Sequence, residues 1–480
     1  MNTELIKKKI LDLAIRGKLV EQRPEDGTAE ELYTHIQEEK KKLIAEGKIK
    51  KEKPLPKIKE DDIPFKLPKN WKWVRLGDLV TIYGRIGFRG YTKQDIVPKG
   101  TGAISMSPSN ISISGECCFE ECTYISIEKY LESPEIILSN NDIVIVKTGS
   151  SFGKSCIVKK RYDEKITLNP QLVVLKNILI NTNYLNYSLK TQSAFSQYNN
   201  FVVGTAVPTF SQEKLKNFIL PLPPLEEQKR IVAKIEEIFS RIDVIEKAKA
   251  DLAKDGNLLK KKILDLAIRG KLVEQRTEEC TAKELYSKSK VEKALPSVTE
   301  EEIPFNIPNN WKWIKLGNLC SIARGASPRP IKEYITDDIN GINWIKIGDT
   351  TEGNKYITSA EEKITKEGAK KSRFVHAGDF LLTNSMSFGH PYILSIDGCV
   401  HDGWLILSNY SDCYDKLFLY YLLSSSFAYI QFSDTASGST VKNLNSVKVA
   451  NSVFPLPPLA EQKRIVAKIE ELLPYCDLFK

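Results

Sequence analysis

The sequence predicts an α+β fold: two mixed α/β domains with curved β-sheets, separated by antiparallel coiled-coil helices in a pseudo-two-fold circular arrangement. Two observations predict it. First, long segments occur twice along the 480 residues, which marks an internal duplication. Second, each copy places a region of short β-branched runs and Gly, Asn and Ser turns between helical segments, which is typical of compact sheet domains.

The first repeated segment is a helix that starts in a proline-rich sequence. PLPPLEEQKRIVAKIEE begins at Pro221 and PLPPLAEQKRIVAKIEE at Pro455. Prolines suit a first helical turn, whose N–H groups have no partner within the helix. Apolar residues then recur at steps of four and three, as on a coiled-coil seam. The predicted seam residues are Ile231, Ile235, Ile238, Ile242, Ile245, Leu252, Leu259, Ile263, Leu266, Ile465, Ile469 and Leu472.

The second repeated segment, KKKILDLAIRGKLVEQR, occupies residues 7–23 and, unchanged, residues 260–276. Gly256 and Asn257 lie between the two central helical segments and predict a turn. Residues 221–276 are therefore expected to form a helical hairpin. Because the two chain ends carry copies of the same segments, they are expected to pair as the central arms do, which would close the arrangement.

The tryptophan motif NWKW starts at Asn70 and again at Asn310, and alternation around it predicts a strand that docks each globular domain. The longer Lys-rich connection in the first copy indicates a linker. The predicted domains are an N-terminal helical arm and linker (1–69), a first globular domain (70–220), the central hairpin (221–276), a linker (277–309), a second globular domain (310–454) and a C-terminal helix (455–480).

Composition excludes several classes. The net charge of +9 permits a nucleic-acid partner without requiring one. Residues 1–10 lead directly into an amphipathic helix and no long apolar run occurs, which predicts a cytoplasmic protein with no membrane partner. The nine cysteines indicate reduced thiols. Cys117, Cys118 and Cys122 lack the paired spacing of a zinc site, so no metal is predicted.

Catalytic motifs are also missing. TGSSFGKS, from Thr148, has one residue too few for a phosphate-binding loop. LNPQL, from Leu168, lacks the second proline and the aromatic ring of an adenine methyltransferase motif, and no glycine-rich cofactor loop opens a Rossmann unit. Paired metal-binding carboxylates of a nuclease are not evident near Asp142 or Asp379. No catalytic residue is predicted, and a fused nuclease or methyltransferase is disfavoured.

The repeated PLPPLxEQKRIVAKIEE helices and KKKILDLAIRGKLVEQR arms, the twin NWKW motifs and the Gly-Thr and Gly-Ser turns before each helix resemble the specificity subunit of type I restriction-modification enzymes. The resemblance implies a non-catalytic subunit whose two target-recognition domains read the halves of a bipartite DNA site. It also implies two modification subunits that use S-adenosylmethionine to methylate adenine N6, and restriction subunits that cut DNA with ATP and Mg. This chain itself would hold no cofactor.

Loop residues with hydrogen-bond donors are the candidates for contact with double-stranded DNA, because arginine and asparagine suit base edges, whereas lysine and serine more often hold phosphate. The alternative for each is a solvated loop end. The candidates are Arg85, Arg89, Lys147, Ser151, Lys154, Thr205, Arg324, Arg329, Lys346, Asn384, Ser387, Ser439 and Lys442. The alternative for the whole chain is a coiled-coil scaffold or interaction protein without DNA readout.

Overall fold

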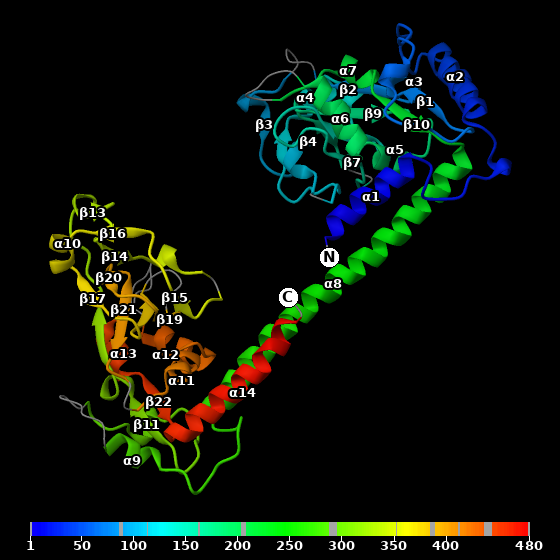
Figure 1. Cartoon of the computed structure of the whole chain (residues 1–480). Coiled ribbons are helices and arrows are strands. Elements are labelled where there is room, and N and C mark those ends of the chain that lie inside the picture. The colour runs from blue at the N-terminus through cyan, green and yellow to red at the C-terminus, as the bar shows by residue number, and fades with distance from the viewer. Residues whose placement is uncertain are drawn as a thin grey trace. The chain divides into compact units, whose positions relative to one another are not determined.

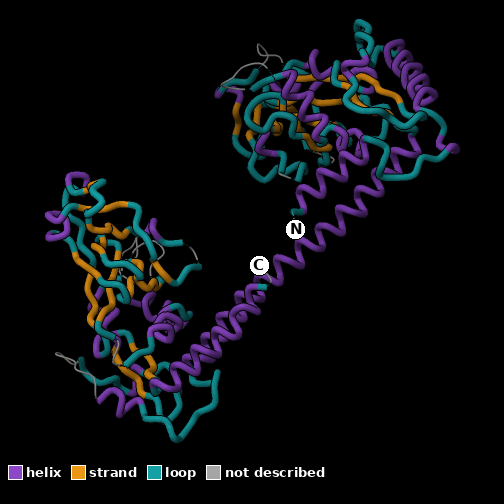
Figure 2. The backbone as a smooth tube through the Cα atoms, viewed as in Figure 1, coloured by secondary structure: helices purple, strands orange, loops and turns teal. Residues whose placement is uncertain are grey.

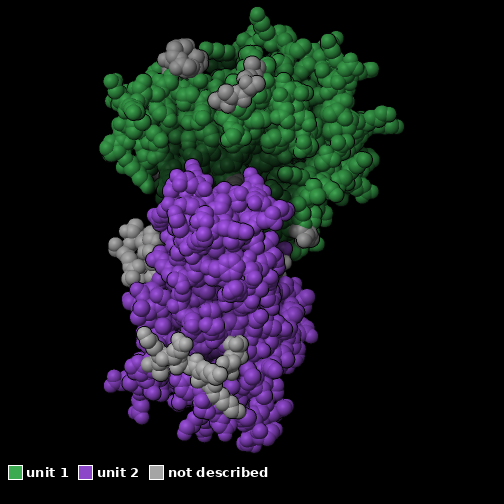
Figure 3. Space-filling model, turned by 60° about the vertical axis from the view of Figure 1, so that its left-hand side comes forward, with its two compact units in different colours: residues 1–246 green, residues 247–480 purple. Residues whose placement is uncertain are grey.

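The computed structural model describes residues 2–85, 90–112, 114–161, 164–202, 208–287, 295–351, 353–384, 389–410, 413–435 and 444–478. It contains two compact units, Met1–Glu246 and Lys247–Lys480, which are coloured separately in Figure 3. Each unit combines helices with mixed sheets (Figure 1), so the predicted α+β class is confirmed.

The first unit holds ten strands and seven complete helices among its described residues, together with the first part of helix α8. The helices are α1 (Thr3–Ile15), α2 (Ala29–Ala45), α3 (Leu76–Leu79), α4 (Ile127–Leu131), α5 (Thr182–Ser188), α6 (Gln192–Phe201), α7 (Gln212–Lys216) and α8 (Leu225–Ile268). The strands are β1 (Lys72–Arg75), β2 (Thr81–Gly84), β3 (Ile96–Val97), β4 (Ala103–Met106), β5 (Thr123–Ile125), β6 (Ile143–Val146), β7 (Ser155–Ile157), β8 (Ile166–Leu168), β9 (Leu172–Lys176) and β10 (Ile219–Leu222).

The second unit repeats this plan with different loops. Besides the second part of α8, its helices are α9 (Ala282–Ser287), α10 (Lys366–Lys370), α11 (Lys416–Leu423), α12 (Ser426–Thr435), α13 (Ser446–Asn451) and α14 (Leu459–Asp477). Its strands are β11 (Lys312–Lys315), β12 (Ser321–Arg324), β13 (Ile335–Thr336), β14 (Ile342–Ile345), β15 (Tyr356–Ile357), β16 (Glu362–Ile364), β17 (Arg373–Val375), β18 (Phe380–Thr383), β19 (Pro391–Leu394), β20 (Gly398–Val400), β21 (Trp404–Ser408) and β22 (Val453–Leu456).

Each unit contains two larger sheets and one small ribbon (Figure 2). In the first unit the strand orders are β2-β9-β6-β7, all antiparallel, and β3-β5-β4-β8, in which β4 and β8 run parallel. In the second they are β12-β21-β18-β19-β15 and β13-β16-β14-β20-β17. The ribbons pair β1 with β10 and β11 with β22, so the strands that carry Trp73 and Trp313 dock where the sequence predicted them.

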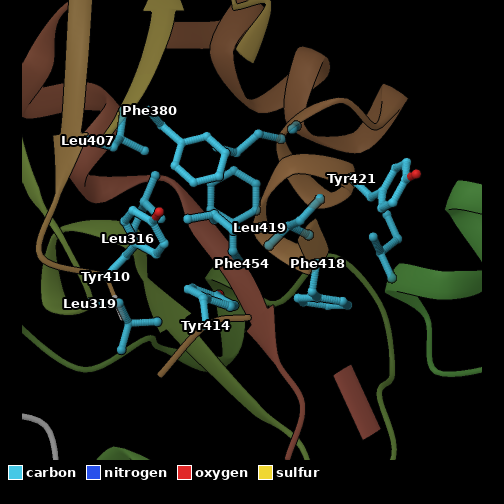
Figure 4. Packing of buried hydrophobic residues seen from close by; sticks show 14 of the residues in the cluster. Leu316, Leu319, Phe380, Leu407, Tyr410, Tyr414, Phe418, Leu419, Tyr421 and Phe454 are labelled. Carbon is cyan, nitrogen blue, oxygen red and sulfur yellow. The ribbon is translucent and has the colours of Figure 1, made fainter. Parts of the chain in front are cut away.

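Alternation along the central strands explains why the sheets are buried on both faces. In β6, Ile143 and Ile145 pack in the core formed with the helices, whereas Val144 and Val146 pack in a second core on the other face. Successive side chains of a strand point to opposite faces, so an unbroken run of β-branched residues suits a sheet covered on both sides. The second unit shows the same division, and Figure 4 shows its helix-side core, which includes Phe380, Phe418 and Phe454.

The prediction of a central helical hairpin was wrong. Residues Leu225–Ile268 form one continuous helix of 44 residues, with Gly256 and Asn257 inside it. A glycine costs only about 1 kcal/mol in a helix interior, which the neighbouring packing can offset. Gly256 has a packing reason: a Cβ atom there would lie 2.6 Å from the backbone oxygen of Cys476 in α14. The glycine allows close helix packing instead of making a turn.

Each half of α8 pairs with one terminal helix through equivalent contacts. In the first unit Lys7 of α1 forms an ion pair with Asp243 at 2.7 Å. In the second unit Lys260 of α8 forms an ion pair with Asp477 of α14 at 2.5 Å. Lys7 and Lys260 occupy the same position of one repeated segment, and Asp243 and Asp477 the same position of the other. The duplication in sequence is therefore a duplication of helix pairs.

The predicted seam is buried only where a partner helix covers it. Ile231, Ile235, Ile465 and Ile469 are fully buried. Ile242 and Ile263 are also buried, and Ile238, Leu266 and Leu472 are partly buried. By contrast, Ile245, Leu252 and Leu259 are about half exposed, at 46–48%. These three lie toward the middle of α8, near or beyond the ends of α1 and α14, which explains why the heptad pattern alone did not predict their exposure.

Candidate nucleic-acid interface

A buried carboxylate at the start of each long helix fixes the globular part of the unit to that helix. Glu227 is fully buried and accepts hydrogen bonds from Trp71 Nε1 at 3.0 Å and Gln22 Nε2 at 3.0 Å. Glu461 is equally buried and accepts from Trp311 Nε1 at 2.9 Å and Gln275 Nε2 at 2.6 Å. Asn70 and Asn310 complete the two sets as further donors at 3.3 Å. We name these two sets the carboxylate latches.

The glutamine that follows each latch glutamate ties down a second segment. Gln228 accepts a bond from the Asn181 N–H at 3.0 Å and donates to the Pro223 carbonyl at 2.8 Å. Gln462 makes the same pair of contacts with Asp415 at 2.7 Å and Pro457 at 2.9 Å. The side chains of the Glu-Gln dipeptide are buried in both copies. They therefore position the neighbouring segments of the chain on the helix.

Burial raises the pKa of the Glu461 carboxyl, while the hydrogen bonds from Trp311 and Gln275 and the charge of Arg464 oppose that rise. Arg464 itself pairs with Glu279 at 2.8 Å, and Arg230 pairs with Asp26 at 2.6 Å at the equivalent place in the first unit. Each latch is therefore flanked by an ion pair that links the helix to the segment after the repeated arm.

Two loops meet at the end of β6 in the first unit. The N–H of Phe210 donates to the Lys147 carbonyl at 3.1 Å, and the Gly149 N–H donates to the Pro208 carbonyl at 3.0 Å. The hydroxyl oxygens of Thr148 and Thr209 lie 2.8 Å apart. The turn after β6, which carries the predicted residues Lys147 and Ser151, is therefore bonded to the segment that directly follows residues 203–207.

The second unit brings the equivalent loops together in the same way. Asn384 follows β18 as Lys147 follows β6, and the Leu444 N–H donates to its backbone oxygen at 3.0 Å. Leu444 occupies the position of Phe210 in the repeat. Asn384 is 1% exposed, and its amide lies 3.5 Å from the Asp402 carbonyl. Two dissimilar sequences thus build the same kind of loop junction, one in each unit. Each junction is the candidate nucleic-acid interface of its unit.

Lys147 has the environment expected of a group that contacts an anion. Its side chain is partly buried, and burial lowers the pKa of the ammonium group. Within the described part of the chain, its Nζ has no hydrogen-bond acceptor or acidic partner. A partly desolvated ammonium group without a counter-charge favours a bound anion such as phosphate.

Arg85 and Lys154 are engaged with the protein instead. Arg85 is 3% exposed and donates to the Leu168 carbonyl at 3.0 Å and to Thr167 Oγ1 at 3.3 Å. Burial lowers the pKa of its guanidinium group. The Lys154 ammonium group donates to the Ile111 carbonyl. Arg85 joins β8 to the end of β2, so its donors support the sheet. Ser151 is partly exposed in the turn after β6.

The second unit has a hollow of about 730 Å³ that is lined in part by two of the predicted cations, Arg329 and Lys346. Arg329, whose side chain is 81% exposed, lies 3.3 Å from Asp402, and Arg324 Nε donates to the Asp402 carbonyl at 3.1 Å. Lys346 pairs with Glu362 at 2.7 Å, and this hydrogen bond raises the pKa of the lysine. The hollow is lined by Ser327, Pro328, Arg329, Pro330, Ile331, Lys332, Trp344, Lys346, Ile347, Gly348, His401 and Asp402.

Asp402 organises this hollow and was missed by the sequence analysis. Ser327 donates to its carboxylate at 2.8 Å, which holds the pKa of that carboxyl below its usual range. The only signal was the polar pair His401 and Asp402 between the apolar runs that became β20 and β21. Arg89, Thr205, Ser387, Ser439 and Lys442 lie outside the described residues.

The described residues contain no group of three or more His, Cys, Asp or Glu side chains placed to hold a metal ion. None of their helices is both long enough and apolar enough to cross a lipid bilayer.

The chain is duplicated, and in each copy a carboxylate latch fixes a globular domain that carries one loop junction to the start of a long helix. This arrangement defines a class of proteins with two equivalent domains, each attached to a helix. The family model described as the type I restriction modification DNA specificity domain matches residues 68–254 and 308–477. The chain therefore belongs to the type I restriction-modification DNA specificity family, as the sequence motifs predicted. It carries two copies of the family's domain and is a specificity subunit.

Curated relatives and solved structures agree. The chain is 26% identical to the type I restriction enzyme EcoAI specificity subunit of Escherichia coli and 27% identical to the EcoEI subunit, with 98% of this chain and 89% of each relative covered. A chain from a solved structure concerned with assembly and conformational transition of the type I R-M system shares the fold with a TM-score of 0.63 at 21% identity, covering 87% of this chain and 93% of that one. The HsdS subunit from Thermoanaerobacter tengcongensis gives 0.51, also at 21% identity, covering 87% and 92%.

Proposed function

We propose that each loop junction reads one half of a bipartite DNA site, through Lys147 and Ser151 at the first and Arg324, Arg329 and Lys346 at the second, where the buried Asn384 supports the loop. The observation that supports this is the shared junction itself: the Phe210 and Leu444 N–H groups bond to equivalent positions, 147 and 384, while the surrounding residues differ. Two junctions that share their backbone geometry but present different side chains are suited to two different half-sites. We extend the proposal to Thr205, Ser387, Ser439 and Lys442, which lie close to these junctions in sequence, and to Arg89, which follows β2.

The partners in this proposal are double-stranded DNA, two modification subunits and the restriction subunits. The modification subunits would bring S-adenosylmethionine, and the restriction subunits would use ATP and Mg, so that this chain holds no cofactor of its own. The relatives are named as specificity subunits of type I restriction enzymes, which supports this division of roles. A complex that acts on chromosomal DNA operates in the cytoplasm.

Exchange of residues 70–220 for the equivalent domain of a relative is the direct test. We expect the assembled complex to methylate a new sequence in one half of its site and to keep the other half, because the second junction is untouched. Methylation is mapped across a genome with and without the exchange. An unchanged methylation sequence would support the alternative, a coiled-coil scaffold without DNA readout.

Replacement of Lys147 by glutamine tests the first junction. We expect DNA affinity at low salt to fall by about tenfold and the slope of log affinity against log salt to fall by about 1, because one phosphate contact is lost. The half-site sequence should stay the same. Binding is titrated over a salt series with the chain assembled with its modification subunits.

Lys234→Gln is the matched control, because it removes the same charge from an exposed position of α8 in the same unit. It should leave the salt slope unchanged. Equal effects of the two substitutions would mean that Lys147 acts only through net charge and makes no local contact with DNA.

A further inference from the structure

Two cysteines that play no part in DNA reading lie against each other in the first unit. The Sγ atoms of Cys117 and Cys156 are 3.2 Å apart. Cys156 lies in β7 and is fully buried, whereas Cys117 is partly exposed in the loop before β5. A disulfide bond is about 2.05 Å long. Closure of this pair therefore needs the two sulfur atoms to approach by little more than 1 Å.

The loop that carries Cys117 is closed on itself and bonded to the hairpin of β6 and β7. An isolated β-bridge between Ile111 and Cys117 closes the loop, and the Lys154 ammonium group, from the turn of the hairpin, donates to the Ile111 carbonyl. Cys117 Sγ also lies 3.4 Å from the Ile157 carbonyl, beside Cys156 in β7. The two thiols thus come from segments that are fixed to each other by other contacts, so their approach does not depend on a chance rotamer.

The surroundings favour a thiolate at Cys117. The hydrogen bond from Cys156 is the main cause that lowers the pKa of the Cys117 thiol, and the backbone and charge of Lys159 act in the same direction. Lys190 is near as well: a Cβ at Gly115 would lie 2.2 Å from its Nζ. Burial of the thiol and, more weakly, the Glu116 carboxylate oppose this lowering of the pKa. A thiolate beside cationic groups and a second thiol is the environment of a reactive cysteine.

Cys122, a further thiol close to this pair, has an environment that favours its protonated form. Burial raises the pKa of Cys122, whose Sγ receives a weak contact from the Asn110 amide at 3.4 Å. Cys122 is therefore expected to stay protonated and slow to react. The cluster therefore contains one activated thiol, one buried partner in contact with it, one unreactive neighbour and the exposed thiol of Cys118, which is next to Cys117 in sequence.

We propose that Cys117 and Cys156 form a reversible dithiol switch that hydrogen peroxide oxidises to a disulfide. The Cys117 thiolate attacks one peroxide oxygen, the O–O bond breaks, and the departing hydroxide takes a proton to become water. This leaves a sulfenic acid on Cys117. The Cys156 sulfur then attacks the Cys117 sulfur and displaces hydroxide, which leaves as water with the Cys156 thiol proton. Two thiols are oxidised by two electrons, and one peroxide is reduced to two waters.

Oxidation would fasten residues 114–118 to β7. The hairpin of β6 and β7 carries Ser151 and Lys154 in its turn, and Lys154 already bonds to this loop. The switch therefore stiffens the support of the first loop junction. Its chemistry stands independently of DNA reading, so the test needs no DNA and no partner subunit.

The test treats the folded full chain with hydrogen peroxide near neutral pH, blocks remaining thiols and maps peptides without reduction. We expect a linked peptide pair that contains Cys117 and Cys156, a mass loss of two hydrogen atoms, and recovery of both thiols with dithiothreitol. In Cys156→Ser, the sulfenic acid at Cys117 should persist and be trapped by dimedone. Circular dichroism before oxidation confirms that the variant is folded.

Cys280→Ser is the matched control, since Cys280 is an exposed thiol in the second unit. It should leave the linked pair intact. Oxidation confined to the exposed thiols Cys118 and Cys280, or a link from Cys156 to Cys118, would overturn the proposal. Loss of the Cys117–Cys156 link in Cys280→Ser would overturn it as well, because the pair would then depend on exchange with another thiol.

Discussion

Replacement of Glu227 by alanine is expected to destabilise the first unit by about 3–5 kcal/mol, close to the cost of breaking a buried charge-bearing network. The carboxylate is fully buried and accepts bonds from Trp71, Gln22 and Asn70. Without it, these donors lose their acceptor, and each buried unsatisfied donor costs about 1–3 kcal/mol. The indole cannot turn to solvent, because Trp71 is itself buried.

The duplication supplies the second half of this experiment. Glu461→Ala should destabilise the second unit by a similar amount, because Trp311, Gln275 and Asn310 form the same network. Amide hydrogen exchange separates the two effects, since each substitution should speed exchange mainly in its own unit. Protection lost equally in both units by either substitution would contradict two independent latches.

Glu226→Ala is the matched control for the first latch. Glu226 is exposed, and among the described residues its ion-pair partner is Lys229, one turn away. Such surface pairs contribute about 0–1 kcal/mol. The second copy already has alanine at the equivalent position, Ala460. The control should leave hydrogen exchange nearly unchanged, so that any large effect of Glu227→Ala reflects the buried carboxylate and not loss of acidic charge at the helix start.

The latches also show how far sequence reasoning reached. The repeated Pro-Pro-Leu-x-Glu-Gln motif predicted a helix start, and α8 and α14 do begin there, at Leu225 and Leu459. The paired tryptophan motifs predicted docking strands, which β1 and β11 confirm. The sequence could not indicate that Glu227 faces inward, because its partners lie more than a hundred residues away. An acidic residue in the first turn of a helix also suits the helix dipole when it is solvated, so the position of Glu227 alone does not indicate burial.

The candidate interface was harder to predict for the same physical reason. Arg85 looked like a loop donor, but its acceptor is the Leu168 carbonyl in a strand that local sequence cannot place beside it. Asp402 escaped notice because its role depends on Ser327 and Arg329 reaching it from a distant loop. Residue type and turn position identified the loop that carries Lys147. Only the fold shows that the Lys147 ammonium group has no partner among the described residues, whereas the Lys154 ammonium group donates to the Ile111 carbonyl.

At Gly256 the local sequence predicts a turn, whereas in the structure the residue packs against a distant helix. Its substitution is therefore expected to have a large effect on stability. Alanine at a glycine inside a helix normally stabilises the protein by about 1 kcal/mol. Here the sign is expected to reverse. A Cβ at Gly256 would meet the backbone oxygen of Cys476 at 2.6 Å, and this backbone atom can yield only if at least the last turn of α14 moves. Overpacking of this kind costs about 1–3 kcal/mol.

A graded series makes the test decisive. Gly256→Ala should lower the stability of the second unit, and Gly256→Leu should lower it further, with faster amide exchange in α14 and a weaker ion pair between Lys260 and Asp477. Gly348→Ala is the matched control, since a Cβ there meets no atom within 4 Å. A helix break at Gly256, as the sequence pattern predicted, would leave room for a side chain, so both substitutions would then be neutral or stabilising. Destabilisation that grows with side-chain size follows only if α8 is continuous and α14 packs directly on its glycine.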